Sequence, residues 1–493
     1  MAGLLPLSLA APRWTRTLSG TAGQQNVVIV VFDAFSAYNI SLYGYQRETT
    51  PNLRRLSKRA IVYHNHYAGS NFTTSGTASL LTGTIPWTHR AIKGDGEVAS
   101  EFVERTLFAA FDDYYRLAYT HNPWAFTLLD QFAEQIDDLI PKQKLYLRSY
   151  DSFLYDFFNT DEDIASVSWA RNVGIEDQYA YSLFLSHIDK VLREKEYSRI
   201  RRDYPLGLPL LANGMPFLLA QAIDWIANRL TAISQPFFGY FHFLPPHAPY
   251  RPPAEFVTRF AGDGYHPPDK PADVFAADQI HEPVPAARMH YDQFILHADE
   301  EFGRFYDRLE RSGLLENTWL VLTSDHGEMF ERGIVGHGSD ALYQPLMCIP
   351  LMIFEPGRQQ GMEIQALTSA VDLLPTLAHL TGHAIPSWAE GVLLPPYASG
   401  QPDANRVVYA ARATRNKPTA PLTVASTMLV KGDYKLHYYF GYPALHGSPK
   451  VQLYNVRADA EEMKDLSSTE KDIAAALLGE LKTKIADVNR PYE

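Results

Sequence analysis

Two long apolar runs, each ending near an aspartate, dominate the pattern of hydrophobic and polar positions along the chain. Residues 26–35 read NVVIVVFDAF, and residues 317–328 read NTWLVLTSDHGE. A continuous β-branched run without polar alternation is typical of a strand covered on both faces in a parallel sheet. Residues 235–250 contain a further run of this kind, which breaks into a proline-rich loop. The pattern therefore predicts a mostly parallel central sheet.

Segments with helical periodicity separate these strands. A helix is expected to begin near Thr50 and Pro51 and to lead into a strand, because proline is favoured in the first helical turn. Residues 215–230 and 291–313 repeat their apolar positions at three- and four-residue intervals, as amphipathic helices do. This alternation predicts an α/β fold in which helices flank the central sheet.

The length of 493 residues favours two domains or one large α/β unit. From about residue 400 the pattern changes to shorter strands and a final helix, which predicts a smaller C-terminal α+β subdomain. Residues 126–215 are helical and aromatic and repeat no chemistry, so we interpret them as an insertion that shapes a pocket or a partner surface. The expected division is a flexible N-terminal segment at 1–25, a main α/β domain at 26–400 with the helical insertion at about 126–215, and the C-terminal subdomain at 401–493.

The composition narrows the choice of partners. The formal net charge is −12 and no cluster of Lys and Arg stands out, so nucleic acid is not expected as a partner. Small anionic substrates remain compatible with this charge if a metal ion supplies positive charge locally. The single cysteine, Cys348, excludes an internal disulfide and a cysteine metal cluster.

No apolar run reaches the roughly 18 residues that a membrane span requires. Residues 1–20 contain a short apolar patch with no charged residue ahead of it, which makes a poor signal peptide. We interpret them as a floppy terminus or as the remnant of a removed targeting or membrane segment.

The ends of two predicted strands carry candidate metal ligands. Asp33 directly follows the first apolar run, and Asp325 and His326 follow the second. Functional groups gather at the carboxyl ends of strands in parallel sheets. One oxygen from each aspartate and a neutral imidazole form a ligand set for a divalent cation such as Mn²⁺ or Zn²⁺, with a position left for a nucleophile or a substrate oxygen. The alternative for either aspartate alone is a cap on the following turn.

A hydroxyl-rich stretch is the candidate source of a nucleophile. Residues 70–83 read SNFTTSGTASLLTG and predict a short helix that ends at Gly83. The pKa of a free hydroxyl must fall by roughly eight units, about 11 kcal/mol, for it to ionise near neutrality, and a bound dication supplies such a shift. The first amides of the helix can also hold an anionic group. The alternative is a polar N-cap with no chemical role.

Several blocks of the chain, read in order, carry a family resemblance. TTSGTASLLTG resembles the sulfatase signature Cys-x-Pro-Ser-Arg-x-x-Leu-Leu-Thr-Gly, and PFFGYFHFLPPHAPYRPP resembles the substrate-histidine block of that family. The most specific match is NTWLVLTSDHGEMFERGIVGHGSDALYQPLMCIPLMIFEPG. The chain is therefore similar to the sulfatases of the alkaline phosphatase superfamily over most of its length. The resemblance implies their α/β fold and a metal-dependent cleavage of esters.

Departures from the signature change the chemistry that the resemblance implies. The catalytic Cys or Ser of the family, which is converted to formylglycine, falls on Thr73, and threonine is not a substrate for that conversion. Ala34 replaces the second aspartate of the first ligand block, and Asp325-His326 stands where many sulfatases have Asp-Asn. This set resembles superfamily branches that cleave phosphorus esters with a threonine nucleophile. We therefore expect hydrolysis or transfer of a phosphodiester, phosphomonoester or phosphonate group through Thr73, with Thr74 as the fallback.

The resemblance also implies roles for residues around the metal. His247 would contact the substrate oxygens or protonate the leaving group, and His337 is similar to a histidine that binds a second metal ion or the substrate in phosphoethanolamine transferases. Asn71 and Asn122 fit a pocket wall, although polar loop residues usually only satisfy the backbone, and only Asn71 is included as a substrate-binding residue. The expected ligands of one divalent ion (Mn, Zn, Ca or Mg) are Asp33, Thr73, Asp325 and His326, with a second ion near His337.

The expected substrate is a small-molecule, lipid-linked or glycan-linked ester, and a lipid substrate would place the protein beside a membrane. An extracytoplasmic location, periplasmic or at the cell surface, is favoured, and the oligomeric state is not indicated. Two alternatives stay open. One is a sulfuric ester hydrolase that works without formylglycine, although a threonine sulfate would be hard to release. The other is a catalytically inactive sulfatase-fold binding module that uses the insertion as its interface.

Overall fold

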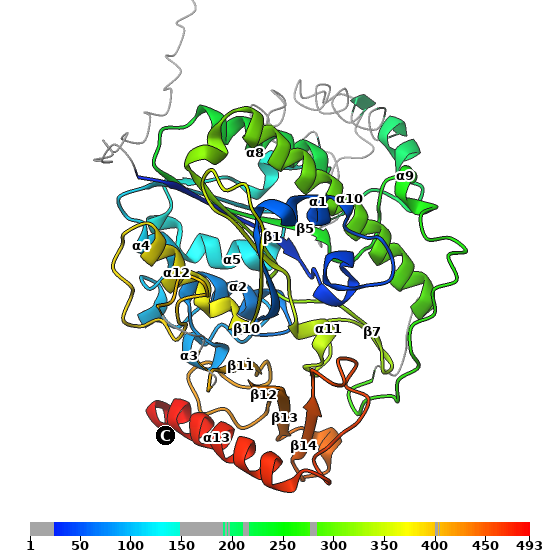
Figure 1. Ribbon diagram of the computed structural model, residues 1–493, viewed down its shortest axis with the longest axis vertical. Helices are drawn as coiled ribbons and strands as arrows, with labels where there is room; N and C mark the ends of the chain where they lie inside the picture. The colour runs from blue at the N-terminus through cyan, green and yellow to red at the C-terminus, as the bar shows by residue number, and fades with distance from the viewer. Residues whose placement is uncertain are drawn as a thin grey trace, which may run out of the picture.

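The computed structural model describes residues 24–147, 191–192, 195, 198–210, 216–276, 283–399, 403 and 405–493. A large α/β unit makes up most of this part of the chain, and a small antiparallel sheet with the C-terminal helix lies at one end of it (Figure 1). Nearly all of the expected N-terminal segment and much of the expected insertion lie outside the described residues. Among the residues that are described, none of the helices combines the length and apolarity needed to cross a membrane.

Eight strands form the central sheet: β1 (Asn26–Asp33), β2 (Ile61–Tyr67), β3 (Tyr115–Thr120), β4 (Asp138–Leu139), β5 (Phe237–Pro246), β6 (Thr318–Thr323), β9 (Leu351–Phe354) and β10 (Met362–Ser369). Their order is β10-β2-β9-β6-β1-β5-β3-β4. Strand β1 lies near the middle and pairs in parallel with β6 and β5. Only β9 runs antiparallel to its neighbours, β2 and β6. The predicted mostly parallel sheet is confirmed.

Helices cover both faces of this sheet. One face packs against α1 (Pro51–Leu56), α8 (Leu219–Ala232) and α10 (Val284–Arg311), and the other packs against α2 (Thr73–Thr82), α5 (Pro123–Gln131) and α12 (Leu373–Leu380). Along β1, Val28 and Val30 enter the first of these cores, whereas Val27 and Ile29 enter the second. Because both faces are buried, every position of the strand from Val27 to Phe32 is apolar, which explains the run without alternation.

The remaining elements of the main unit are short. The helices α4 (Leu107–Ala110), α9 (Ala254–Val257) and α11 (Gln344–Met347) pack around the central layers, and α3 (Pro86–His89) faces the C-terminal sheet. A two-stranded hairpin, β7 (Met329–Glu331) and β8 (Ile334–Gly336), follows β6. This hairpin lies directly after the Asp325-His326 pair, so it shapes the same end of the sheet.

The C-terminal part contains β11 (Val407–Arg412), β12 (Ala425–Lys431), β13 (Tyr434–Phe440) and β14 (Lys450–Asn455), which form an antiparallel sheet in that order, and α13 (Lys471–Asn489). The i, i+4 spacing of Leu477 and Leu481 places both on the apolar face of α13. That face packs on Leu436 and Leu453 of the sheet. The smaller C-terminal α+β unit predicted from the sequence is confirmed.

Two local details differ from the sequence pattern. Residues 114–125 read YYRLAYTHNPWA, a pattern typical of a strand followed by a loop, but helix α5 already begins at Pro123. The first part of the expected insertion belongs to the main unit, because β4, at residues 138–139, adds to the edge of the central sheet beside β3. A two-residue strand carries too little periodicity to be detected.

Candidate active site

The ends of β1 and β6 bring two aspartates together. The strands are parallel neighbours, so Asp33 at the end of β1 and Asp325 two residues beyond β6 lie at the same edge of the sheet. His326 completes the group, with its Nε2 atom 3.5 Å from Asp33 Oδ1 and 3.5 Å from Asp325 Oδ2. All three side chains are fully buried. The structure thus assembles the three side-chain ligands expected from the strand ends.

The hydrogen bonds of this group leave one oxygen of each aspartate without a partner. Asp325 Oδ1 accepts from the backbone N–H of Ala34 and of His326, whereas Asp325 Oδ2 and Asp33 Oδ1 have no hydrogen-bond partner. His326 Nδ1 lies 2.8 Å from the carbonyl of Gly327, so Nδ1 carries the proton and Nε2 presents a lone pair. Buried polar atoms without partners are costly unless a ligand satisfies them. One ligand atom from each of the three residues lies within 4.8 Å of the others, a spacing that fits a divalent cation.

The electrostatics of the two aspartates point to the same conclusion. Burial raises the pKa of Asp325, and the charge of Asp33 raises it further. For Asp33, burial alone would also raise the pKa, but His247, His242 and His326 outweigh it, so the pKa lies below the usual range. Two adjacent buried carboxylates resist being ionised together unless positive charge lies between them. A divalent cation bound between them would supply that charge.

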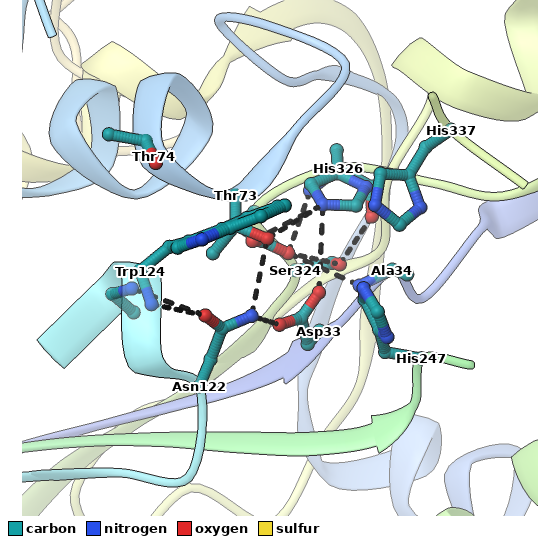
Figure 2. Close-up of polar contacts among 12 residues, drawn as sticks. Asp33, Ala34, Thr73, Thr74, Asn122, Trp124, His247, Ser324, His326 and His337 are labelled. Atoms are coloured by element: carbon teal, nitrogen blue, oxygen red, sulfur yellow. Dashed lines mark hydrogen bonds and ion pairs between the residues drawn. The ribbon is translucent and has the colours of Figure 1, made fainter. Parts of the chain in front are cut away.

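Thr73 is the first residue of α2, and its hydroxyl points into this group (Figure 2). Its Oγ1 lies 3.3 Å from His326 Nε2. The helix approaches closely because Gly76 has no side chain: a Cβ there would lie 2.2 Å from the carbonyl oxygen of Asp325. The hydroxyl of Thr74 instead donates to the carbonyl of Gly94 and points away. Of the two candidate nucleophiles, the structure brings only Thr73 to the carboxylates.

His247 and His337 lie beside the group and are partly exposed. The ring of His337 is 4.3 Å from that of His326 and 4.8 Å from that of His247. His337 Nδ1 contacts both carboxylate oxygens of Glu328, at 3.1 and 3.2 Å, and His247 Nδ1 contacts the carbonyl of Ala248. Both histidines therefore have their Nε2 atoms available for a substrate or an ion.

Asn71 is placed differently from the expectation. Its Nδ2 donates to the carbonyls of Ser339 and Ala341, at 2.9 and 2.8 Å, and its Oδ1 accepts from Arg412 at 2.9 Å. The amide therefore fastens the loop that carries His337 rather than turning toward the metal group. Its role as a substrate-binding residue gains no support from this geometry.

Two further residues reach the group, and the sequence analysis did not select them. Asn122 Nδ2 donates to Asp33 Oδ2 and lies 3.3 Å from Thr73 Oγ1. His242, in the middle of β5, places Nε2 3.4 Å from Asp33 Oδ2 and 3.7 Å from Asp325 Oδ2. A signal exists for each: Asn122 precedes a proline and so marks a helix start, and His242 is a lone polar residue in an apolar run.

The chain matches known proteins over most of its length. The family model named Sulfatase matches residues 25–383. The chain belongs to the sulfatase family. A choline-sulfatase from Rhizobium meliloti is 25% identical over 474 residues, which cover 91% of this chain and 83% of that protein. The multifunctional alkaline phosphatase superfamily protein PehA from Trinickia caryophylli is 23% identical over 430 residues, covering 77% and 78%.

Among solved structures, the phosphonate monoester hydrolase of Agrobacterium radiobacter superposes with a TM-score of 0.65 at 18% identity, over 95% of this chain and 96% of that one. At this identity the likeness establishes the fold. The family match makes the protein a sulfatase-family hydrolase of the alkaline phosphatase superfamily.

Proposed function

We propose that this sulfatase-family protein hydrolyses a singly charged ester of phosphorus, a phosphodiester or a phosphonate monoester, through a covalent intermediate on Thr73. The observation that carries the proposal is the position of Thr73 Oγ1, 3.3 Å from His326 Nε2 and beside two carboxylates with unsatisfied oxygens. A threonine at this place attacks an ester directly and has no route to formylglycine.

The charges around the group favour a monoanion. In the described part of the chain, the side-chain contacts of Asp33 and Asp325 come from histidine, serine and asparagine, and none comes from lysine or arginine. Arg412, at the far side of the His337 loop, is paired with Asp340. A dianionic phosphate monoester would bring one more negative charge into a buried site with no further fixed cation. A diester or a phosphonate monoester brings one charge fewer.

A divalent cation held by Asp33 Oδ1, Asp325 Oδ2 and His326 Nε2 would lower the pKa of the Thr73 hydroxyl and balance charge on the phosphoryl oxygens. Thr73 releases its proton to solvent, and Oγ1 then attacks phosphorus in line with the departing oxygen. The Oγ1–P bond forms as the P–O bond to the leaving alcohol breaks. The free N–H groups of the first turn of α2 hold the non-bridging oxygens.

His247 is the proton carrier in this scheme. Burial alone would lower the pKa of His247, but Asp33 and Glu328 raise it above its usual value, so the ring can hold a proton. Its Nε2 gives that proton to the leaving oxygen. In the second step Nε2 takes a proton from the water that attacks the phosphothreonine, which regenerates Thr73 and releases the acid.

A sulfate monoester is the second candidate substrate, because it is also singly charged and because the choline-sulfatase relative covers 91% of the chain. The two candidates differ in the second step. Water displaces the threonine oxygen from the phosphorus of a phosphothreonine more readily than from the sulfur of a threonine sulfate. A sulfated Thr73 would therefore accumulate, and each enzyme molecule would cleave only one sulfate ester.

The test uses four nitrophenyl reporters, a phosphodiester, a phenylphosphonate, a phosphomonoester and a sulfate, with Mn²⁺- or Zn²⁺-reconstituted protein. We expect diester and phosphonate turnover that Thr73→Ala abolishes and Thr73→Ser retains in part, together with a phosphoryl adduct on Thr73 detected by mass spectrometry after an acid quench. Multiple turnover of the sulfate in preference to the phosphorus esters would overturn the proposal. Silence on all four reporters with metal bound would favour the binding module.

A further inference from the structure

Asn122 stands at the start of α5, and its amide is fully used. Oδ1 accepts from the backbone N–H of Trp124 at 2.8 Å and of Ala125 at 3.3 Å, as the N-cap of α5. Only an oxygen can accept from these two N–H groups, so the orientation of the amide is fixed and Nδ2 must face the other way. Helix α5 therefore aims the two hydrogens of Nδ2.

The two hydrogens of Nδ2 have two acceptors. One is Asp33 Oδ2, the oxygen that does not face His326, and the other is Thr73 Oγ1 at 3.3 Å. Asn122 is 3% exposed, so water does not compete for these contacts. A single side chain thus connects a candidate metal ligand to the candidate nucleophile (Figure 2).

The direction of the hydrogen bonds around Thr73 gives this contact a chemical meaning. Asn122 Nδ2 carries only hydrogens and can only donate to Thr73 Oγ1, whichever way the hydroxyl proton points. The bond from Asn122 arrives at a lone pair of Oγ1 and does not depend on that proton. It therefore persists when Oγ1 is deprotonated, and a hydrogen bond to the anion is the stronger one.

From this geometry we infer that Asn122 is a further catalytic residue, whose amide stabilises the Thr73 oxyanion while holding Asp33 so that only Oδ1 faces the metal position. The inference rests on the proposed function, because it assigns Asn122 to attack by Thr73. It also explains why the asparagine is preferable to the other good N-cap residues: serine, threonine and aspartate cap a helix, but none of them offers an N–H₂ group.

The decisive variant is Asn122→Ser, which keeps a helix cap and loses the donor. We expect kcat/KM for the best phosphorus ester to fall roughly 100- to 1,000-fold, the loss seen when one donor to a reacting oxyanion is removed. We expect the melting temperature to stay close to that of the wild type, and the Mn²⁺ dissociation constant by titration calorimetry to rise about tenfold or more as Asp33 loses its orientation. Asn122→Asp, which keeps the cap and replaces the donor by a carboxylate, should be at least as inactive.

Capping variants separate catalysis from structure. Thr106→Ala removes the N-cap of α4, whose Oγ1 accepts from Ala109 N at 3.1 Å, and should lower the melting temperature with little change in kcat/KM. Wild-type activity in Asn122→Ser, with loss only in Asn122→Ala, would reduce Asn122 to a cap and overturn the inference. If Thr73→Ala stays active, the proposed function fails; if Thr73→Ala is inactive and Asn122→Ser retains full activity and metal affinity, only the inference about Asn122 fails.

Discussion

Glu462 gives a prediction whose magnitude follows from the structure. Its side chain is 1% exposed and lies between β13 and α11. It forms an ion pair with Lys435 Nζ at 2.9 Å, lies 3.2 Å from His437 Nε2, and accepts a hydrogen bond from the backbone N–H of Gln344 at 2.7 Å. Burial alone would raise its pKa, but Lys435 and His437 outweigh burial and lower the pKa from 4.5 to about 2.

This difference makes stability depend on pH. A folded-state pKa below the unfolded-state value means that the carboxylate stabilises the fold above pH 4.5 and that this contribution is lost as the pH falls toward 2. At about 1.4 kcal/mol per pH unit, the contribution is about 3 kcal/mol at pH 7, of which about 2 kcal/mol is lost by pH 3. Glu462→Gln removes it and leaves Lys435 buried without its charged partner, so it should destabilise the protein at pH 7 by about 3 to 5 kcal/mol.

The assay is urea unfolding of metal-free wild type and Glu462→Gln in EDTA, at pH 7, 5, 4 and 3. The difference in unfolding free energy should shrink by about 2 kcal/mol between pH 7 and pH 3. Glu101→Gln, at an exposed position, is the control and should change the unfolding free energy by little. A Glu462→Gln difference that stays constant over this range would refute the reasoning.

Three further outcomes are expected at the active site. Gly76→Ala should lower kcat by 100-fold or more, because a Cβ would lie 2.2 Å from the Asp325 carbonyl oxygen and push α2 away. The control Gly479→Ala, with open space around it, should leave kcat unchanged. Equal effects of the two substitutions on kcat would contradict this. Adding Mn²⁺ to EDTA-treated protein should raise the melting temperature by several degrees, and Asp325→Asn should abolish the rise; a rise that survives would place the ion elsewhere. His242→Phe should weaken Mn²⁺ binding about tenfold or more in titration calorimetry, whereas His242→Gln, which keeps a donor near Asp33, should bind close to wild type; loss in both would make the imidazole itself the requirement.

The features that the sequence predicts best are single elements and the residues that follow the end of a strand. The proximity of Asp33 and Asp325 could be predicted because each follows an apolar run, and the carboxyl ends of parallel strands lie at the same edge of a sheet. The pattern carries no direction, so the antiparallel β9 could not be distinguished from its parallel neighbours. Family resemblance then selected Thr73 among several hydroxyls, and only the position of α2 separates it from Thr74.

The same reasoning could not predict the contacts that Asn122 and His242 make with the site. Asn122 is 49 residues from Thr73 in the chain, and its contact depends on β3 lying two strands from β1 through β5. His242 looks like an ordinary member of an apolar strand until the register places it beside Asp33. Contacts of this kind come from strand order, which the periodicity of each strand does not contain.

The bond between Arg412 and Asn71 has a consequence for engineering. Arg412 ends β11 of the C-terminal sheet, and its guanidinium also donates to the carbonyl of Gly338, next to His337. A chimera that exchanged the C-terminal sheet for that of a relative would keep every chemical group of the catalytic edge and still alter the loop that carries His337. The boundary between the two sheets is therefore a poor crossover point for recombination. A recombination library should take residues 69–72, 337–341 and 412 together from one parent.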